Sequence, residues 1–361
     1  MTITKKQICL LFMTVIPSTK LLILPTVYAH YAAQDAWLAG AINLILDAML
    51  LVVLLAVIKK FNGKTFFEVL ELSLGKWVAR AVYMLYAVYF AISAVLPVFE
   101  QKMFIEITLY ETAPSVLTFL PFFLISFYFS LKGINATART GEILFFLTAS
   151  AFLLITFLSL GSARPYYLRP MLKNPVFRTL KASYSGLLWH GQPLMLLFFA
   201  GRIKTEKRFS LSVIASFAAA AFVCVFMYAL FTCIYGDIAV RQIYALTKMT
   251  KYAIALSNVG RFDYVATLLV TAGATLTLSL PFVLSVDCFT QAIGRDKRLV
   301  PALALNLCAL VLVAIYHMRF RTVMDLFEKF FIPAMIALVY ILPTCTLLLR
   351  RTSQNAPLCK E

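Results

Sequence analysis

The sequence predicts an all-α integral membrane protein with about ten transmembrane helices. Apolar residues make up 62% of the 361 positions and charged residues only 14%, and the mean hydropathy is +0.87. Soluble domains are usually about half apolar and a quarter charged. Apolar stretches of about twenty residues, the length that a helix needs to cross a bilayer, recur along the whole chain. Most of the surface is therefore expected to face lipid.

Reading for such stretches places ten spans along the chain, with boundaries set to within a few residues. The predicted spans are 7–29, 36–58, 78–107, 114–131, 142–161, 184–200, 209–235, 262–293, 299–317 and 325–349. The third and eighth are long, so we expect them to be tilted. The stretch 238–258 mixes Arg241, Lys248 and Lys251 with apolar residues, which favours an interfacial helix. An eleventh span is the alternative.

The net charge of +17 fits loops beside a membrane better than a nucleic-acid footprint. Lys and Arg occur mostly in short runs between apolar stretches, such as Lys59-Lys60 and 295–298. Such runs are typical of loops next to an anionic cytoplasmic leaflet. With the N-terminus inside, and with Arg80 at the inner end of span 3 counted with the inner loops, the division is 19 basic residues inside and 11 outside, and Lys20, Lys102 and Lys329 lie within spans. Both termini are therefore predicted to be cytoplasmic.

The first and sixth predicted spans are interrupted by helix-breaking and polar residues. Span 1 contains Pro17-Ser18-Thr19-Lys20 and then Pro25, and span 6 contains Gly186 and then Trp189-His190-Gly191-Gln192-Pro193. Non-helical backbone at membrane depth is tolerated where it lines a cavity. Matching breaks in the first spans of two halves, 7–161 and 184–349, indicate an inverted-repeat transporter fold with a midplane site. The alternative is that Pro and Gly are simply frequent in membrane helices.

No catalytic or metal-binding constellation is present in the sequence. Seven cysteines are scattered without C-x-x-C spacing, and His30, His190 and His317 are far apart. There is no G-x-S-x-G motif and no P-loop. We therefore expect neither an enzyme nor a disulfide framework, and neither a metal site nor a cofactor.

The predicted loops contain a series of short motifs in a fixed order. The motifs are Gln34-Asp35-Ala36-Trp37, Lys64-Thr65 with Glu68 and Gly75-Lys76-Trp77, Glu111-Thr112-Ala113-Pro114, Gly133-Ile134 with Ala138-Arg139 and Glu142, and Arg261-Phe262-Asp263. At these spacings the set resembles the B subunit of bacterial spore germinant receptors, a branch of the amino acid–polyamine–organocation permease superfamily. The resemblance runs from Ile3 to about Arg350, and it departs from the family at Ser18, Gly260 and Gln192-Pro193.

The resemblance implies a single transmembrane domain over 1–361, with the five-plus-five inverted repeat of the leucine-transporter type. It implies a place in the inner membrane of the spore, beside an A subunit and a lipoprotein C subunit. It also implies that the chain senses a small nutrient germinant, often an amino acid. An active amino-acid transporter and a scaffold subunit that has lost its site remain alternatives, and nucleic acid is not an expected partner.

In such a fold, half-helix N-termini point at an anionic group such as an amino-acid carboxylate, and the free N–H groups near Ser18, Thr19, His190 and Gly191 are the candidates. Span 8 adds Thr267, Thr271 and Thr275 on one face, although small hydroxyl residues also favour plain helix packing. Trp189 and His190 have packing as their alternative roles. The predicted ligand-binding residues are Pro17, Ser18, Thr19, Lys20, Trp189, His190, Gly191, Thr271 and Thr275.

Charged residues inside spans cost about 2.5–3.5 kcal/mol or more when they are unpaired. Lys20 and Asp47 fall at similar depth in adjacent spans, which predicts an ion pair between spans 1 and 2 that could also couple to ligand or protons. Lys102 and Glu106 are spaced as an i,i+4 pair. Tyr86, Ser93 and Glu100 share a face of span 3, and Asp287 near the inner end of span 8 has no partner that the sequence identifies.

Overall fold

The computed structural model describes residues 2–61, 63–108, 115–172, 175–203, 208–242, 249, 262–294, 297–316 and 319–348. Within these ranges the chain is almost entirely helical, and the extended structure is one parallel bridge between Ile3 and Ile203. The all-α membrane class predicted from composition is confirmed, since seven of the described helices are long and apolar enough to cross a bilayer.

Each predicted span corresponds to one helix or to a consecutive set of helices. The helices of the first half are α1 (Lys5–Lys20), α2 (Leu24–Ala32), α3 (Ala36–Lys60), α4 (Phe66–Leu74), α5 (Lys76–Ser93), α6 (Val95–Thr108), α7 (Ser115–Lys132) and α8 (Ile134–Leu160). Those of the second half are α9 (Val176–Gly186), α10 (Met195–Phe199), α11 (Phe209–Tyr235), α13 (Phe262–Ile293), α14 (Leu299–Tyr316), α15 (Phe320–Leu326), α16 (Ile332–Met335) and α17 (Leu342–Thr346).

Two predicted spans are less regular than the sequence suggests. Span 3 was expected to be one long helix, but it divides at Ala94 into α5 and α6. Span 10 contains π-helical turns at Phe327–Phe331 and Ile336–Ile341, and such turns are frequent at functional sites. Most of the predicted interfacial helix 238–258 lies outside the described residues. Its first part belongs to a 3₁₀ turn, Gly236–Arg241.

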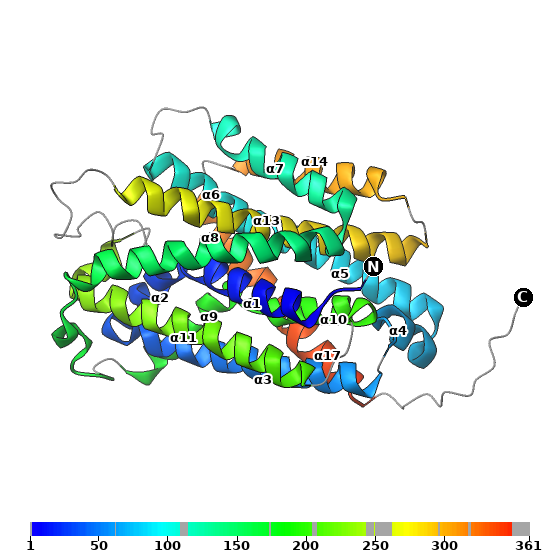
Figure 1. The fold of residues 1–361 in the computed structure, drawn as a ribbon, viewed down its shortest axis with the longest axis horizontal. Helices are drawn as coiled ribbons and strands as arrows, with labels where there is room; N and C mark the ends of the chain where they lie inside the picture. The colour runs from blue at the N-terminus through cyan, green and yellow to red at the C-terminus, as the bar shows by residue number, and fades with distance from the viewer. Residues whose placement is uncertain are drawn as a thin grey trace, which may run out of the picture.

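The helices run roughly along one direction, which identifies the membrane normal (Figure 1). α3 and α11 lie on one side of the bundle, α7 and α14 lie on the opposite side, and α1 and α8 run between them. Lys60 Nζ donates to the carbonyl of Leu347 over 2.7 Å, and Ile3 N donates to the carbonyl of Arg202 over 2.7 Å. The first bond joins the end of span 2 to the end of span 10. The second joins the N-terminal segment to the segment that follows span 6.

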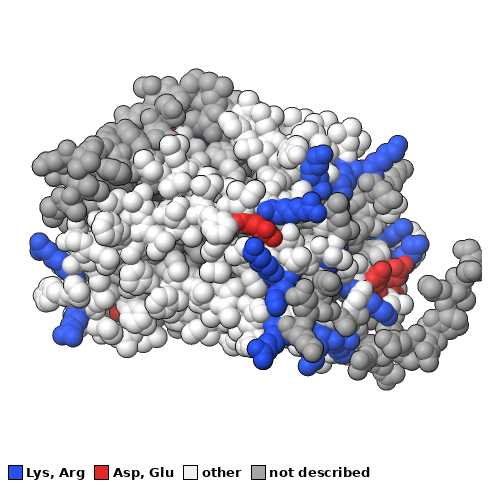
Figure 2. Space-filling view, viewed as in Figure 1, with Lys and Arg blue, Asp and Glu red and all other residues white. Residues whose placement is uncertain are grey.

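The visible surface has the charge distribution of a membrane protein. Figure 2 shows a broad uncharged belt with Lys and Arg at the two ends, and most of them lie toward the end where Figure 1 places the N-terminus. Large apolar side chains are exposed along this belt, and Phe157 on α8 and Phe222 on α11 are 75% and 71% exposed. Lipid is the expected neighbour of such side chains.

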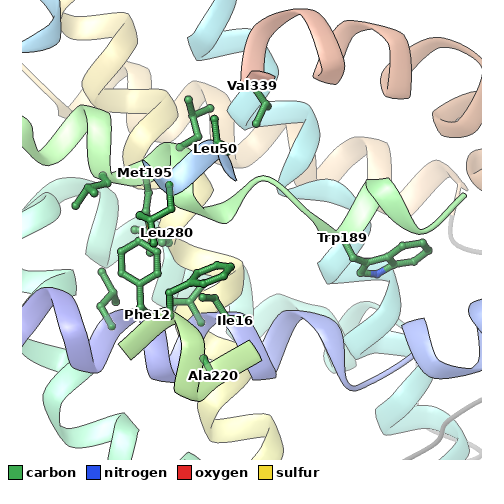
Figure 3. Close-up of a cluster of buried hydrophobic side chains, with 14 of the residues drawn as sticks. Phe12, Ile16, Leu50, Trp189, Met195, Ala220, Leu280 and Val339 are labelled. Carbon is green, nitrogen blue, oxygen red and sulfur yellow. The ribbon is translucent and has the colours of Figure 1, made fainter. Parts of the chain in front are cut away.

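The interior holds a continuous apolar cluster that draws on helices from both halves of the chain. Figure 3 shows Phe12 and Ile16 of α1 gathered with Met195 of α10 and Leu280 of α13, whereas Trp189 stands apart from this group. The helices around the breaks are therefore packed on their apolar sides, and this packing fixes the position of the polar residues between them.

Candidate ligand site at the two helix breaks

The break in span 1 lies between α1 and α2, at Leu21–Ile23. Pro25 is the second residue of α2, and because proline lacks an N–H and its ring clashes with the carbonyl four residues earlier, a helix starts here rather than continuing. The sequence marked Pro17–Lys20 and Pro25 as the interrupting residues, and the break lies between them. Pro17 lies inside α1, and Lys20 is the last residue of that helix.

Two carbonyls at this break accept from side-chain hydroxyls. Tyr228 donates to the carbonyl of Lys20 over 3.2 Å, and Thr26 donates to the carbonyl of Ile23 over 2.6 Å. The Ile23 carbonyl also accepts from the backbone N–H groups of Thr26 and Val27. Hydrocarbon offers no water for such groups, so these bonds make the unwound segment tolerable at membrane depth.

The break in span 6 is centred on His190 and Gly191. α9 ends at Gly186, a 3₁₀ turn covers Leu187–Trp189, and a second turn begins at Gln192. Gly191 has φ of 88°, and a Cβ there would lie 2.9 Å from Val339 Cγ1. Glycine is therefore needed at this position both for its left-handed backbone and for the close approach of span 10.

The two breaks meet at Lys20, whose side chain is completely buried. Its ammonium nitrogen lies 3.1 Å from Asp47 Oδ2, 2.7 Å from the carbonyl oxygen of Trp189 and 2.6 Å from Gln192 Oε1. It also lies 3.1 Å from His190 Nδ1. An ammonium group has three hydrogens to donate. The three oxygens account for all of them.

Asp47 is the acceptor at the centre of this network, and its side chain is also completely buried. Its Oδ2 accepts from Lys20 and from His190 Nδ1, the latter over 2.7 Å. Its Oδ1 accepts from the backbone N–H of Gly191 over 2.9 Å and from the hydroxyl of Tyr340 over 3.0 Å. A carboxylate has about four lone-pair sites, so the four donors, from spans 1, 6 and 10, satisfy it.

The hydrogen bonds around His190 assign its tautomer. Asn43 Nδ2 donates to the hydroxyl of Tyr28 over 3.0 Å, and that hydroxyl lies 3.0 Å from His190 Nε2. Since the tyrosine oxygen already accepts from Asn43, its own hydrogen goes to Nε2. Nδ1 then carries the ring hydrogen and donates it to Asp47. A neutral ring also avoids a second positive charge beside Lys20.

A cavity of about 80 Å³ adjoins this network. By the same measure a single water needs about 10–15 Å³, so the cavity can hold several waters or a small organic molecule. Its lining comes from α1, α5, α6, the span 6 break, α10, α13 and the π-helical turn of span 10. The polar residues among the lining are Thr19, Ser93, His190, Gln192 and Thr277, and the apolar ones include Tyr89, Trp189, Leu280 and Phe331.

Four of the predicted ligand-binding residues line the cavity, namely Thr19, Trp189, His190 and Gly191. Lys20 lies behind the lining in the polar network. The other four lie elsewhere. Pro17 is inside α1, and the buried hydroxyl of Ser18 faces Gly273 of α13.

The predicted span 8 threonines do not contribute to the cavity lining. Thr271 has a buried hydroxyl without a partner among the described residues, and Thr275 donates to the carbonyl of Ala272. Thr277 lines the cavity instead. The step-of-four threonine pattern therefore selected a face of the helix that does not line this cavity.

Two residues that bond directly to the Lys20 ammonium or the Asp47 carboxylate were not predicted. Gln192 could have been found as the polar residue that follows the glycine of the break. Tyr340 lies inside an apolar span with no distinguishing signal, and only the packing of span 10 against the breaks brings it to Asp47.

Several other charged residues inside the spans also have polar partners. Lys102 and Glu106 lie 2.9 Å apart within α6, and Glu100 accepts a hydrogen bond from the indole N–H of Trp189. Asp287, for which the sequence indicated no partner, pairs with Arg202 at 3.0 Å and with Arg298.

Comparison with known structures places the fold among membrane transporters. The chain is similar to the manganese transporter of Eremococcus coleocola in complex with an aromatic bis-isothiourea compound, with 13% identity, a TM-score of 0.63, and coverage of 92% of this chain and 75% of the transporter. A single-substitution mutant of that transporter gives 12% identity, a TM-score of 0.55, and coverage of 95% and 75%. At this identity the likeness shows the fold alone, and it confirms the leucine-transporter-type architecture.

Comparison of sequences identifies the family. Spore germination protein YndE of Bacillus subtilis (strain 168) is 25% identical over 185 residues, which is 50% of this chain and 51% of that protein. The match thus spans about half the length of that relative. A family model described as "Spore germination protein" matches residues 2–322. This match covers nearly the whole chain, and the chain therefore belongs to the spore germination permease family.

Proposed function

We propose that the chain is a nutrient-sensing subunit of a spore germination receptor, and that it binds a small germinant, such as an amino acid, in the cavity between the two breaks. The observation that carries the proposal is the position of this cavity. Its lining includes residues of both broken spans. Ligand sites in inverted-repeat transporters lie at such places.

The chemistry of the lining suits a ligand that donates hydrogen bonds. The hydroxyls of Thr19, Ser93 and Thr277 each donate to a carbonyl of their own helix. Their lone pairs then remain to accept from a ligand. The α-ammonium group of an amino acid is one such donor, and Tyr89, Leu280 and Phe331 offer apolar contact to its side chain.

The remaining parts of the proposal rest on family membership. An A subunit and a lipoprotein C subunit are the proposed partners, in the inner membrane of the spore, with both termini in the cytoplasm. We propose a single domain over 1–361 as the unit that folds.

An active amino-acid transporter is the second candidate, because the similar solved structures are those of a transporter. Uptake of labelled amino acids into vesicles that contain the purified chain separates the two. Accumulation above the level of empty vesicles supports transport, and binding without accumulation supports sensing. The manganese carried by the solved transporter suits this cavity poorly, because the buried Lys20 ammonium would repel a divalent cation.

The test of the ligand site uses two serines with the same local bonding. Ser93 lines the cavity and donates to the carbonyl of Phe90, whereas Ser150 is exposed on α8 and donates to the carbonyl of Leu147. Ser93→Trp should fill the cavity and abolish both the germination response and the ligand-induced rise in melting temperature. Ser150→Trp should leave both unchanged at equal membrane abundance. A normal response in the Ser93 variant contradicts the placement.

A further inference from the structure

The surroundings of the Lys20 ammonium are those of a binding site for a cation. Three oxygen acceptors from two different spans converge on one nitrogen at 2.6–3.1 Å, and they comprise a carboxylate, a backbone carbonyl and a side-chain amide. We refer to Asp47 Oδ2, the carbonyl oxygen of Trp189 and Gln192 Oε1 together as the ammonium site. Lys20 reaches it from a third span, at the end of α1.

The acceptors of the ammonium site are held by bonds that do not involve Lys20. Asp47 accepts from His190, Gly191 and Tyr340. The indole of Trp189 donates to Glu100, and Gln192 Nε2 donates to the carbonyl of Trp189 over 2.9 Å. A site whose acceptors are fixed in this way is preorganised, and it should persist when the lysine side chain is removed.

Lys20 is likewise positioned by contacts remote from its charge. Its carbonyl accepts from Tyr228, and its helix packs against α11, α8 and α13. Tethering the ammonium to α1 removes most of the entropy that a free cation would lose on binding. The ammonium site is therefore occupied by a charge of the protein itself and needs no dissolved cation.

We propose that the ammonium site is a binding site for primary ammonium groups, and that the Lys20 ammonium is its resident occupant. Unwound carbonyls at half-helix ends bind the coupling cations of transporters with this architecture. Here the carbonyl of Trp189, at the end of a short 3₁₀ turn, binds a charge of the protein itself. Trp189 and Gln192 also line the cavity, so the site adjoins it. The proposal concerns the occupant of the ammonium site and does not depend on which ligand the cavity takes.

The size of the lysine side chain defines the probe that tests this site. Lys20→Ala removes three methylene groups and the ammonium, and it leaves a buried space with one unpaired carboxylate. The propylammonium ion has three carbons and one primary ammonium group, so it matches what was removed. Tetramethylammonium carries the same charge but has no N–H to donate, and it is a matched control ion.

The experiment measures the melting temperature of the purified chain in detergent against the concentration of each ion. Lys20→Ala should melt several degrees below the wild type, and propylammonium should restore a saturable part of that loss because a ligand that binds the folded state stabilises it. Tetramethylammonium should not restore it. The wild type should gain less from propylammonium than Lys20→Ala does, since its ammonium site is already filled.

Two further variants control for a general effect of the ion. Lys102→Ala also removes a buried lysine from an ion pair, but its partner Glu106 is 22% exposed and can be hydrated. Lys20→Met keeps a side chain of similar length that fills the space. Neither should respond to propylammonium as Lys20→Ala does. An equal response in either variant, or equal effects of the two ions on Lys20→Ala, overturns the proposal.

Should Lys20→Ala not fold, its abundance in membranes becomes the measurement. Cells that express it are grown with propylamine or with tetramethylammonium at equal concentration. Higher abundance with propylamine, and no such difference for Lys20→Met, supports the ammonium site. Equal abundance under both conditions counts against it, and neither outcome depends on the identity of the germinant.

Discussion

Gly191 donates its backbone N–H to Asp47 Oδ1 over 2.9 Å, and this bond ties the break of span 6 to the middle of span 2. The same carboxylate accepts from Lys20 of span 1 and from Tyr340 of span 10. Spans 1, 2, 6 and 10 therefore share one buried anion. A change of charge at either Lys20 or Asp47 is expected to affect all of them.

The first prediction concerns the ion pair of Lys20 and Asp47. Lys20→Met alone or Asp47→Leu alone should lower the free energy of unfolding by about 3–5 kcal/mol, because each leaves the other charge buried without its partner. The double variant should recover much of the loss. A double-mutant cycle on unfolding in detergent measures the coupling, which is about 0.5–3 kcal/mol for residues in contact. Simple addition of the two losses would show that the pair does not interact.

The second prediction concerns the packing of the Tyr28 ring, whose hydroxyl bonds to His190. A Cβ on Gly186 would lie 2.3 Å from Tyr28 Cε1, whereas nothing lies within 4 Å of one on Gly161. Gly186→Ala should displace the ring and destabilise the chain by about 1–3 kcal/mol, as overpacking does. Gly161→Ala is the matched control and should change the melting temperature little. Similar melting temperatures of the two variants would argue against a tightly packed Tyr28.

The third prediction concerns Asp287 and its two arginines. Asp287 is almost fully buried, while Arg202 and Arg298 are 30% and 26% exposed, so solvent weakens the two pairs. Asp287→Asn should therefore cost no more than about 2 kcal/mol, yet more than Asp237→Asn at an exposed site. The measurement is the difference in melting temperature at low and high salt. A larger loss at Asp237 would reject the structural role of the cluster.

The fourth prediction concerns orientation in the membrane. Because basic residues divide 19 to 11 with the N-terminus inside, a cysteine at Lys297 should be protected from an outside reagent, and one at Arg169 should be labelled. Both positions are exposed. The labelling is done on intact cells in a background without cysteine. The reverse pattern would invert the orientation while leaving the fold unchanged.

The sequence by itself determined the membrane class, the approximate spans and the location of the breaks. These follow from composition and from periodic local signals, since a helix in hydrocarbon must be apolar and must satisfy its own backbone. The pairing of Lys20 with Asp47 could also be inferred, because two opposite charges at equal depth in adjacent spans have few other ways to lower their cost.

Only the tertiary structure decided which residues complete the site. The step-of-four pattern selected Thr271 and Thr275, yet the rotation of α13 turns Thr277 to the cavity, and rotation is set by packing against neighbours rather than by local sequence. Packing also brings Gln192 to the Lys20 ammonium and Tyr340 to the Asp47 carboxylate. A hydrogen bond needs two atoms within about 3 Å, and for residues nearly 300 positions apart that distance depends on how the whole bundle packs.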